Sequence, residues 1–274
     1  MIKAFFEYQF LQNALIASLL ASVVCGVIGV IIIEKKLVML SGAIAHTSYG
    51  GVGLGYLLGF EPIIGAFAFA ICAAFGIGFV KRKGDSRSDT IISILWSLGM
   101  ALGVLFIAIT PGYPPDLNSY LFGNILSVTK FDLYVISACA FIIVIIISVF
   151  FNDWKTYLFD EEFAAIIGIK TAFLEYLLLV LIAVTVVVLI RVVGIILVIA
   201  LLTAPSGTVS FFIFDLKKRM FYSVLLSGII CTMGLFISYY FNIASASVIV
   251  IISVIFYLLA YAINSIKNSR KALW

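Results

Sequence analysis

Charged residues are scarce in this sequence. Only 11% of its 274 residues are Asp, Glu, Lys or Arg, whereas a soluble domain carries about 25%. Hydrophobic residues make up 64% of the chain. They arrive in blocks of about 18 or more, the length needed to cross roughly 30 Å of hydrocarbon. Because a chain this apolar cannot cover itself with a polar surface, we expect an integral membrane protein.

Several functional motifs are also missing. No G-x-x-x-x-G-K-[ST] run occurs, which argues against nucleotide hydrolysis through a P-loop. His46 is the only histidine and no H-E-x-x-H occurs, so we expect no metalloprotease. The four cysteines lie inside apolar blocks without a C-x-x-C pair, which predicts packing residues. The net charge of +4 comes from basic residues between apolar blocks. We therefore expect neither an enzyme nor a nucleic-acid partner.

The apolar blocks predict an all-α membrane protein. Each span must satisfy its own backbone hydrogen bonds, which favours helices. We expect a single permease domain over residues 1–274 with about nine transmembrane helices, and eight to ten are compatible with the pattern. The candidate spans are 10–33, 37–60, 63–80, 90–110, 132–151, 172–190, 192–214, 220–241 and 243–263.

The connections between these spans differ in charge. One alternating set holds 14 of the 17 Lys and Arg residues, and the other holds only Lys3, Lys130 and Arg191. Positive loops stay in the cytoplasm. This asymmetry predicts an external N-terminus and a cytoplasmic C-terminus. The basic set consists of Glu34–Lys36, Lys81–Asp89, Asn152–Thr171, Asp215–Arg219 and the tail after Asn264.

Glycines recur at helical spacing in two spans. Gly51, Gly55 and Gly59 share one face of the second span, and Gly99 and Gly103 share one face of the fourth. Small residues at this spacing let helix backbones approach closely. We expect both helices to lie in a tight bundle.

His46 lies near the middle of the second span. An ionisable side chain at membrane depth is a candidate functional residue, and imidazole is a common ligand of transition metals. The alternative is a neutral histidine that bonds a backbone carbonyl between helices. A single ligand predicts transient contact with a metal, completed by oxygen or sulfur donors.

Pro205 lies inside the seventh span, among Thr203, Ser206 and Thr208. Proline within a helix removes one hydrogen bond and frees a carbonyl, here that of Leu201. Either the helix is broken, so that carbonyls and hydroxyls line a cation path, or it is simply kinked.

The stretch from about 153 to 170 is too polar at its start to lie in the membrane. It contains Asp160-Glu161-Glu162 followed by an apolar run to Gly168. Acidic residues suit a helix N-terminus and glycine suits its C-terminal end. We predict a short cytoplasmic helix on which a soluble partner docks.

These segments resemble the permeases of zinc, manganese and iron-type ABC importers. The resemblance rests on six segments in order: EKKLVMLSGAIAHTSYGGVGLGYLLG, DTIISILWSLGMALG, DLNSYLFGNILSVTKFDL, FDEEFAAIIGI, VGIILVIALLTAPSGTV and GLFISYYFNIASASVIVIISVIFYLL. It implies a permease in a prokaryotic cell membrane, related in fold to siderophore and corrinoid permeases. It also implies two copies of this chain, two ATPase subunits and an extracytoplasmic metal-binding lipoprotein or periplasmic protein. A divalent metal would be cargo and not a permanent cofactor.

The resemblance also implies roles for single residues. His46 would lie on the metal path, but Gly42 stands where the family usually has an aspartate. Candidates to line the path are Ser41, Thr47, Ser48, Thr203, Pro205, Ser206 and Thr208. Candidates to contact the ATPase are Asp160, Glu161, Glu162, Phe163, Ala164 and Gly168.

Two other functions stay open from the sequence. A permease for a metal chelate would have a related fold and a similar coupling segment, and the missing aspartate keeps it in view. An ion-coupled carrier would carry an ionisable group at midspan. Acidic residues instead concentrate near span ends, apart from Glu175 just inside the sixth span.

Overall fold

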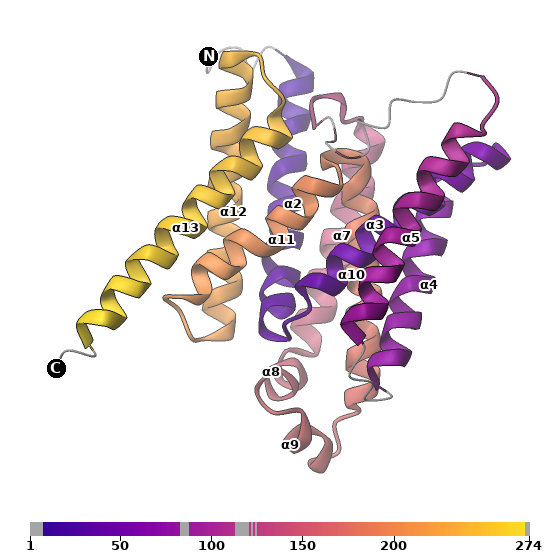
Figure 1. The fold of residues 1–274 in the computed structure, drawn as a ribbon. Coiled ribbons are helices and arrows are strands. Elements are labelled where there is room, and N and C mark those ends of the chain that lie inside the picture. Colours follow the sequence, from indigo (N-terminus) through magenta and orange to yellow (C-terminus); the bar gives the residue numbers. More distant parts are fainter. Residues whose placement is uncertain (1–7, 83–87, 113–120, 122, 124, 272–274) are drawn as a thin grey trace.

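The structure is a computed structural model that describes residues 8–82, 88–112, 121, 123 and 125–271. These residues form helices joined by short connections and include no strand. The helices run in one bundle (Figure 1). Their bounds are α2 Gln9–Glu34, α3 Val38–Leu58, α4 Pro62–Arg82, α5 Ser88–Ala108, η1 Ile125–Ser127, α7 Lys130–Val149, α8 Phe151–Phe159, α9 Glu161–Ile166, α10 Thr171–Val193, α11 Ile195–Ser210, α12 Leu216–Phe241 and α13 Ser245–Lys271.

Each expected span contains one of these helices, but they are not equally apolar. Within the described residues, seven helices are long and apolar enough to cross a membrane, namely α2, α4, α5, α7, α10, α12 and α13. The two others are α3 and α11. Polar and glycine residues lower the hydropathy of α3, which is possible because most of its residues are buried. With 16 residues, α11 is about 24 Å long.

Helix α3 packs between α4 and α5 through its glycines. A Cβ atom added to Gly51 would lie 2.0 Å from the carbonyl oxygen of Gly65 on α4. On the other side, a Cβ atom on Gly99 of α5 would lie 2.3 Å from the Cα atom of Thr47. The predicted close packing is therefore confirmed. Gly59 is an exception, because it ends α3 in the left-handed conformation with φ 73° and has no packing neighbour.

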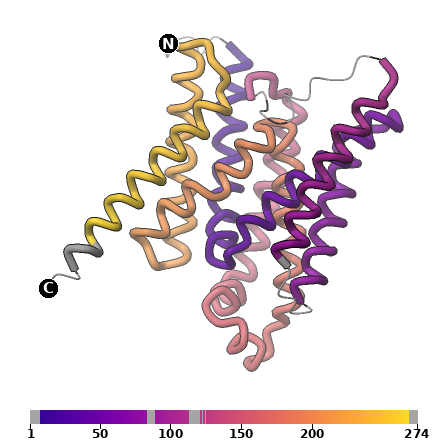
Figure 2. The backbone as a smooth tube through the Cα atoms, in the orientation of Figure 1, coloured from indigo at the N-terminus to yellow at the C-terminus, as the bar shows by residue number. Residues whose placement is uncertain are grey.

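Helix α2 is the core of the other half of the bundle. It packs against α12, α11 and α7. In Figure 2 the indigo tube of α2 runs between the orange and yellow C-terminal helices and the purple pair α4 and α5. Its close approaches use Gly26, which meets the backbone of Val224, and Gly29, which meets the carbonyl oxygen of Leu202.

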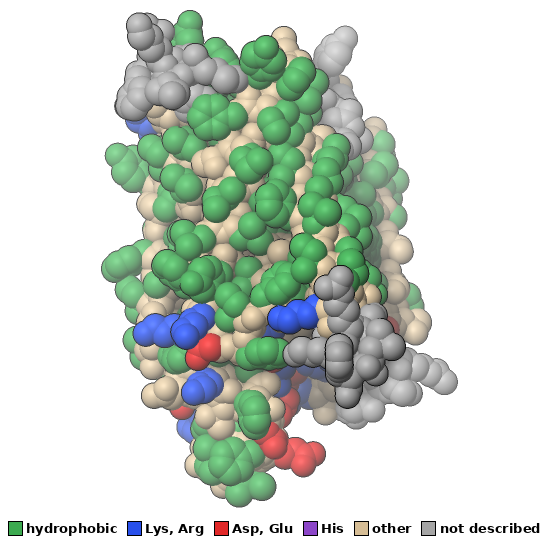
Figure 3. Space-filling model, turned by 90° about the vertical axis from the view of Figure 1, so that its left-hand side faces the viewer, with side chains coloured by type: hydrophobic (Ala, Val, Ile, Leu, Met, Phe, Trp, Pro, Cys, Tyr) green, Lys and Arg blue, Asp and Glu red, His purple; other side chains and the backbone are tan. Residues whose placement is uncertain are grey.

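Most charged side chains gather at one end of the bundle. The space-filling view shows lysines, arginines and acidic residues on the lower part of the molecule, below a surface that is almost wholly apolar (Figure 3). We call this the basic end. It carries the α2–α3 turn, the end of α4, the helices α8 and α9, and the start of α12 (Figure 1). The alternation of connections inferred from the sequence thus corresponds to two ends of one bundle.

Two boundaries differ from the prediction. Helix α10 continues past Arg191 to Val193, and the chain turns at Gly194, whose φ is 81°. Arg191 is therefore in the last turn of a helix and not in a connection. The polar stretch after α7 is also helical from its start, because α8 begins at Phe151. Seven of the 15 residues of the segment Asp116–Lys130 fall outside the described residues, and its later part forms the 3-10 turn η1.

Candidate functional site

The His46 imidazole lies between α3 and α5. It stacks on the indole of Trp96, with 4.4 Å between the ring centroids and 17° between the planes. Its Nδ1 atom is buried and has no hydrogen-bond partner among the residues that the structure describes. The predicted alternative, a neutral histidine that bonds a backbone carbonyl between helices, has no support at this nitrogen.

Trp96 explains the glycine at position 42. A Cβ atom on Gly42 would lie 2.8 Å from the Trp96 ring, closer than carbon atoms pack. The indole thus occupies the space into which a side chain one helical turn before His46 would project. A carboxylate side chain at position 42 would therefore clash with Trp96.

The three hydroxyls near His46 turn toward the backbone. Ser41 donates to the carbonyl of Val38 at 2.8 Å and Ser48 to that of Ala45 at 2.6 Å. Thr47 donates across to Leu95 of α5 at 3.1 Å. Across the described ranges, no group of three or more His, Cys, Asp or Glu residues could hold a metal. The region can contact a passing ion but offers no such cluster to retain one.

The candidate residues on α11 form a separate group. Ser206 shares a hydrogen bond of 2.7 Å with Ser223 of α12 and backs onto Gly29 of α2. Thr203 and Thr208 donate to carbonyls one turn earlier. No described hydrogen bond or ring contact connects these side chains with His46.

Of the two alternatives for Pro205, a broken helix and a simple kink, the break is wrong. Helix α11 runs unbroken from Ile195 to Ser210 with Pro205 inside it. The helix tolerates the proline because only one hydrogen bond is lost and α2 packs tightly against the same turn through Gly29. The real discontinuity is at Gly194, which ends α10 and precedes α11.

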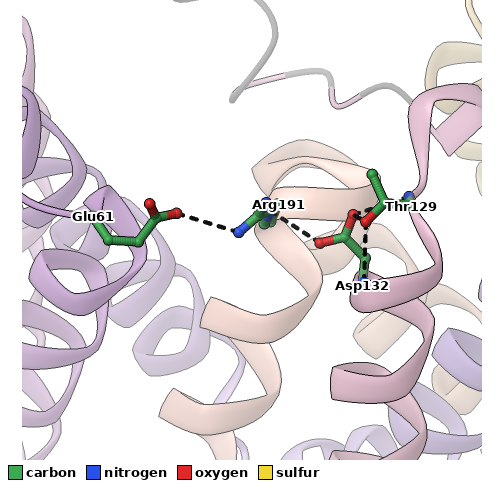
Figure 4. A network of polar contacts seen from close by, with 4 residues as sticks. All are labelled: Glu61, Thr129, Asp132 and Arg191. Atoms are coloured by element: carbon green, nitrogen blue, oxygen red, sulfur yellow. Dashed lines mark hydrogen bonds and ion pairs between the residues drawn. The ribbon is translucent and has the colours of Figure 1, made fainter.

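A polar network lies at the end of the bundle opposite the basic end (Figure 4). Arg191 of α10 contacts Asp132 of α7, with 3.0 Å from Nε to Oδ1, and Glu61 before α4, with 3.4 Å from Nη1 to Oε1. Asp132 also forms a capping box with Thr129. A cavity of about 320 Å³ adjoins it, lined in part by Tyr56, Glu61 and Arg191. We missed this network in the sequence, although T-x-x-D before an apolar run is a capping signal.

The basic end carries a second set of contacts. Lys35, in the α2–α3 turn, lies 2.8 Å from Glu161 of α9, and Glu34 pairs with Arg219 of α12. Glu175 is buried at the start of α10 and lies 3.2 Å from Lys81. The positive charge of Lys81 thus compensates the negative charge of this buried carboxylate. Sequence patterns gave no sign of the pairing between Lys35 and Glu161, which are 126 positions apart.

The predicted short helix near Asp160 is present as α9. The Asp160 side chain caps it by accepting from the backbone N–H of Phe163 at 3.0 Å, and Gly168 follows its end with φ 91°. Ala164 is buried, while Glu161, Glu162 and Phe163 are exposed. Large apolar side chains project outward around it: Phe159 is 94% exposed and Ile166 82% exposed.

These features define a multi-pass helical protein of the cell membrane. Its described residues include no cluster of acidic, histidine or cysteine side chains that could hold a metal. The profile of the ABC 3 transport family matches residues 7–264. The chain belongs to this family, and the resemblance found in its motifs is confirmed.

Individual relatives agree with this assignment. The chain is 34% identical to the manganese transport system membrane protein MntC of Listeria monocytogenes, over 95% of this chain and 92% of the relative. It superposes on PsaBC from Streptococcus pneumoniae in complex with Fab with a TM-score of 0.86 and 35% identity, covering 95% of this chain and 94% of the other. A metal-chelate type ABC transporter in an inward-facing conformation gives a TM-score of 0.74 at 16% identity, covering 95% and 88%. This last likeness concerns the fold.

Proposed function

We propose that this chain is the permease subunit of an ATP-driven importer that moves a divalent transition-metal ion into the cell. The observation that carries the proposal is the similarity over nearly the full length to a manganese transport membrane protein. Manganese is therefore the first candidate cargo, before zinc and iron. The chain itself makes and breaks no covalent bond, and a separate subunit hydrolyses ATP.

We further propose that all nine long helices cross the membrane, including α3 and α11. Helix α3 is enclosed by α4 and α5, so its polar and glycine residues do not meet lipid. Helix α11 follows α10 directly after Gly194 and ends near the basic end (Figure 1). With the basic end in the cytoplasm, the N-terminus is external and the C-terminus is cytoplasmic.

The ATPase subunits dock, in this proposal, on α9 and its surroundings. The helix lies at the basic end and presents Phe163 and Ile166 outward, next to the exposed Phe159 at the end of α8. Exposed apolar side chains next to a set of charges are typical of a protein interface. A second copy of this chain and an extracytoplasmic metal-binding protein complete the assembly by analogy with the family.

The metal passes His46 on its way through the bundle. The free Nδ1 atom supplies a neutral donor that suits transition metals, and the lack of an adjacent carboxylate favours release. Alternating access in a pair of permeases would expose this residue first to one side and then to the other. The residues of α11 act in this mechanism as helix-packing groups, not as ligands.

Uptake into proteoliposomes tests the proposal. Liposomes would contain this chain, its ATPase and its binding protein, with manganese, zinc, ferrous iron or a ferric chelate offered outside. We expect ATP-dependent uptake of a free divalent ion, strongly reduced in His46→Ala and unchanged in Cys72→Ala, whose side chain is exposed on α4. Uptake of the chelate alone would favour a chelate permease, and uptake that persists without the ATPase would contradict an ABC importer.

A further inference from the structure

Two neighbouring charged residues connect the α2–α3 turn with two other helices of the basic end, α9 and α12. Glu34 ends α2 and Lys35 follows it, yet their side chains reach different helices. Glu34 pairs with Arg219 in the first turn of α12. Lys35 pairs with Glu161 at the start of α9. The end of α2 and the three-residue connection 35–37 thus touch the proposed docking helix on one side and α12 on the other.

The Lys35 side chain is held more firmly than an ordinary surface lysine. Only 13% of it is exposed, and its Nζ atom lies 2.8 Å from the Glu161 carboxylate. The same atom lies 3.5 Å from the centroid of the Tyr157 ring on α8, which places the cation over an aromatic face. A tyrosine is uncharged at neutral pH, and burial raises the pKa of the Tyr157 phenol further above its usual range. Lys35 therefore contacts α8 and α9 together.

The backbone of the turn is held in place by burial and a hydrogen bond. Leu37 is buried, and its N–H donates to the carbonyl of Ile32 at 2.8 Å. Lys36 adopts φ 56°, a left-handed conformation that non-glycine residues adopt only when their surroundings hold them there. Helix α3 begins at Val38, so His46 is eight residues further along, about 12 Å in a helix. A displacement of Lys35 must therefore shift the start of α3.

We propose that Lys35 is a positioning residue that transmits the movement of α8 and α9 to the metal-carrying helix α3 and, through Glu34 and Arg219, to α12. This inference rests on the proposed function, since α9 must be where the ATPase acts. In the ATP-driven cycle, the ATPase displaces α9, the contact between Glu161 and Lys35 moves the turn, and α3 follows. Lys35 touches no metal; it connects hydrolysis to transport.

A purely structural ion pair makes a different prediction. If Lys35 only stabilised the fold, its loss would lower the amount of folded complex. ATP hydrolysis and metal uptake would then fall in the same proportion. If it transmits movement, hydrolysis continues while uptake falls. The number of metal ions moved per ATP hydrolysed is therefore the measurement that separates the two roles.

The experiment uses the complete reconstituted transporter with wild type, Lys35→Met, Lys35→Arg and Glu161→Gln. The matched control is Lys218→Met, because Lys218 is exposed at the same end of the bundle, at the start of α12, and makes no ion pair with any residue that the structure describes. Manganese uptake and ATP hydrolysis are measured on the same vesicles. Size-exclusion chromatography of each complex reports assembly.

For Lys35→Met we expect metal moved per ATP to fall about tenfold, a usual size for coupling between sites. Lys35→Arg should restore most of it, since a guanidinium can pair with a carboxylate and stack on an aromatic ring. Glu161→Gln should lower the ratio, and Lys218→Met should leave it unchanged. If Lys35→Met does not assemble, Glu161→Gln decides, because there the lysine keeps its contact with Tyr157.

Two results would overturn the inference. One is an unchanged ratio of uptake to hydrolysis in both Lys35→Met and Glu161→Gln. The other is an equal loss in Lys35→Met and Lys218→Met, which would assign the effect to the positive charge of the basic end and not to the contact with Glu161. If the wild-type complex shows no ATP-dependent metal uptake, the proposed function fails and this inference fails with it. If the wild type takes up metal normally while the variants keep the wild-type ratio, only the inference about Lys35 fails and the proposed function stands.

Discussion

The contact between Gly51 of α3 and Gly65 of α4 gives a sharp prediction about stability. A Cβ atom on Gly51 would lie 2.0 Å from the Gly65 carbonyl oxygen and 2.8 Å from the Ala66 nitrogen. Favourable contacts between carbon atoms lie at about 3.5–4.0 Å. Because the obstructing atoms are backbone, no side chain can rotate away. In Gly51→Ala the two helices must therefore separate at their crossing by more than about 1 Å.

The expected cost follows from this separation. Inserting a methyl group into a well-packed core costs about 1–3 kcal/mol, and the higher helix propensity of alanine returns at most about 1 kcal/mol. We expect Gly51→Ala to destabilise the protein by about 2 kcal/mol, equivalent to a melting temperature lower by roughly 5 °C. Gly65→Ala should behave alike, since its Cβ atom would lie 2.1 Å from the Gly51 oxygen.

Gly76 supplies the control on the same helix as Gly65. It is exposed, and a Cβ atom there would meet nothing within 4 Å. We expect Gly76→Ala to melt at or slightly above the wild-type temperature, because only the propensity gain applies. The assay is size-exclusion chromatography of detergent-solubilised protein after heating across a temperature series. If Gly51→Ala and Gly76→Ala melted together, the close approach of α3 and α4 would be refuted.

Two further predictions concern polar and aromatic contacts. Arg191→Met leaves the buried Asp132 without its cation; since Arg191 is partly exposed, we expect a loss of only about 1–2 kcal/mol. A lower melting temperature than for Lys130→Met would support this, whereas equal values would contradict it. Gly42→Asp forces its side chain against Trp96, so we expect poor assembly that Trp96→Ala partly restores. A double-mutant cycle measures this coupling, and strictly additive effects would argue against the contact.

The helices themselves were predictable from the sequence, because a long apolar block has few alternatives to a helix in lipid. Gly51 and Gly99 also indicated close helix packing, since only small residues permit it. Their partners were not predictable. The helical pattern identifies the face on which Gly51 lies, but the choice of α4 for that face depends on the shapes of all the helices together.

The site was less predictable because its contacts join distant parts of the chain. Pro205 left a break and a kink open from the sequence, but packing against Gly29 of α2 keeps α11 continuous, and the turn is at Gly194. His46 stood out as a lone ionisable residue, whereas its partner Trp96 carries no signal that separates it from a lipid-facing tryptophan. Lys35 looked like one more positive residue at the cytoplasmic surface.

The enclosure of α3 has a consequence for the synthesis of the protein. Single helices partition into the bilayer according to their own hydrophobicity, and α3 falls outside the helices that are apolar enough to do so among those described. In the proposed arrangement, α3 is stable in the membrane only when α4 and α5 cover its glycine face. We therefore expect α3 to enter the bilayer together with α4 and α5, after all three helices have been synthesised. His46 on α3 would thus enter the membrane together with the helices that cover it.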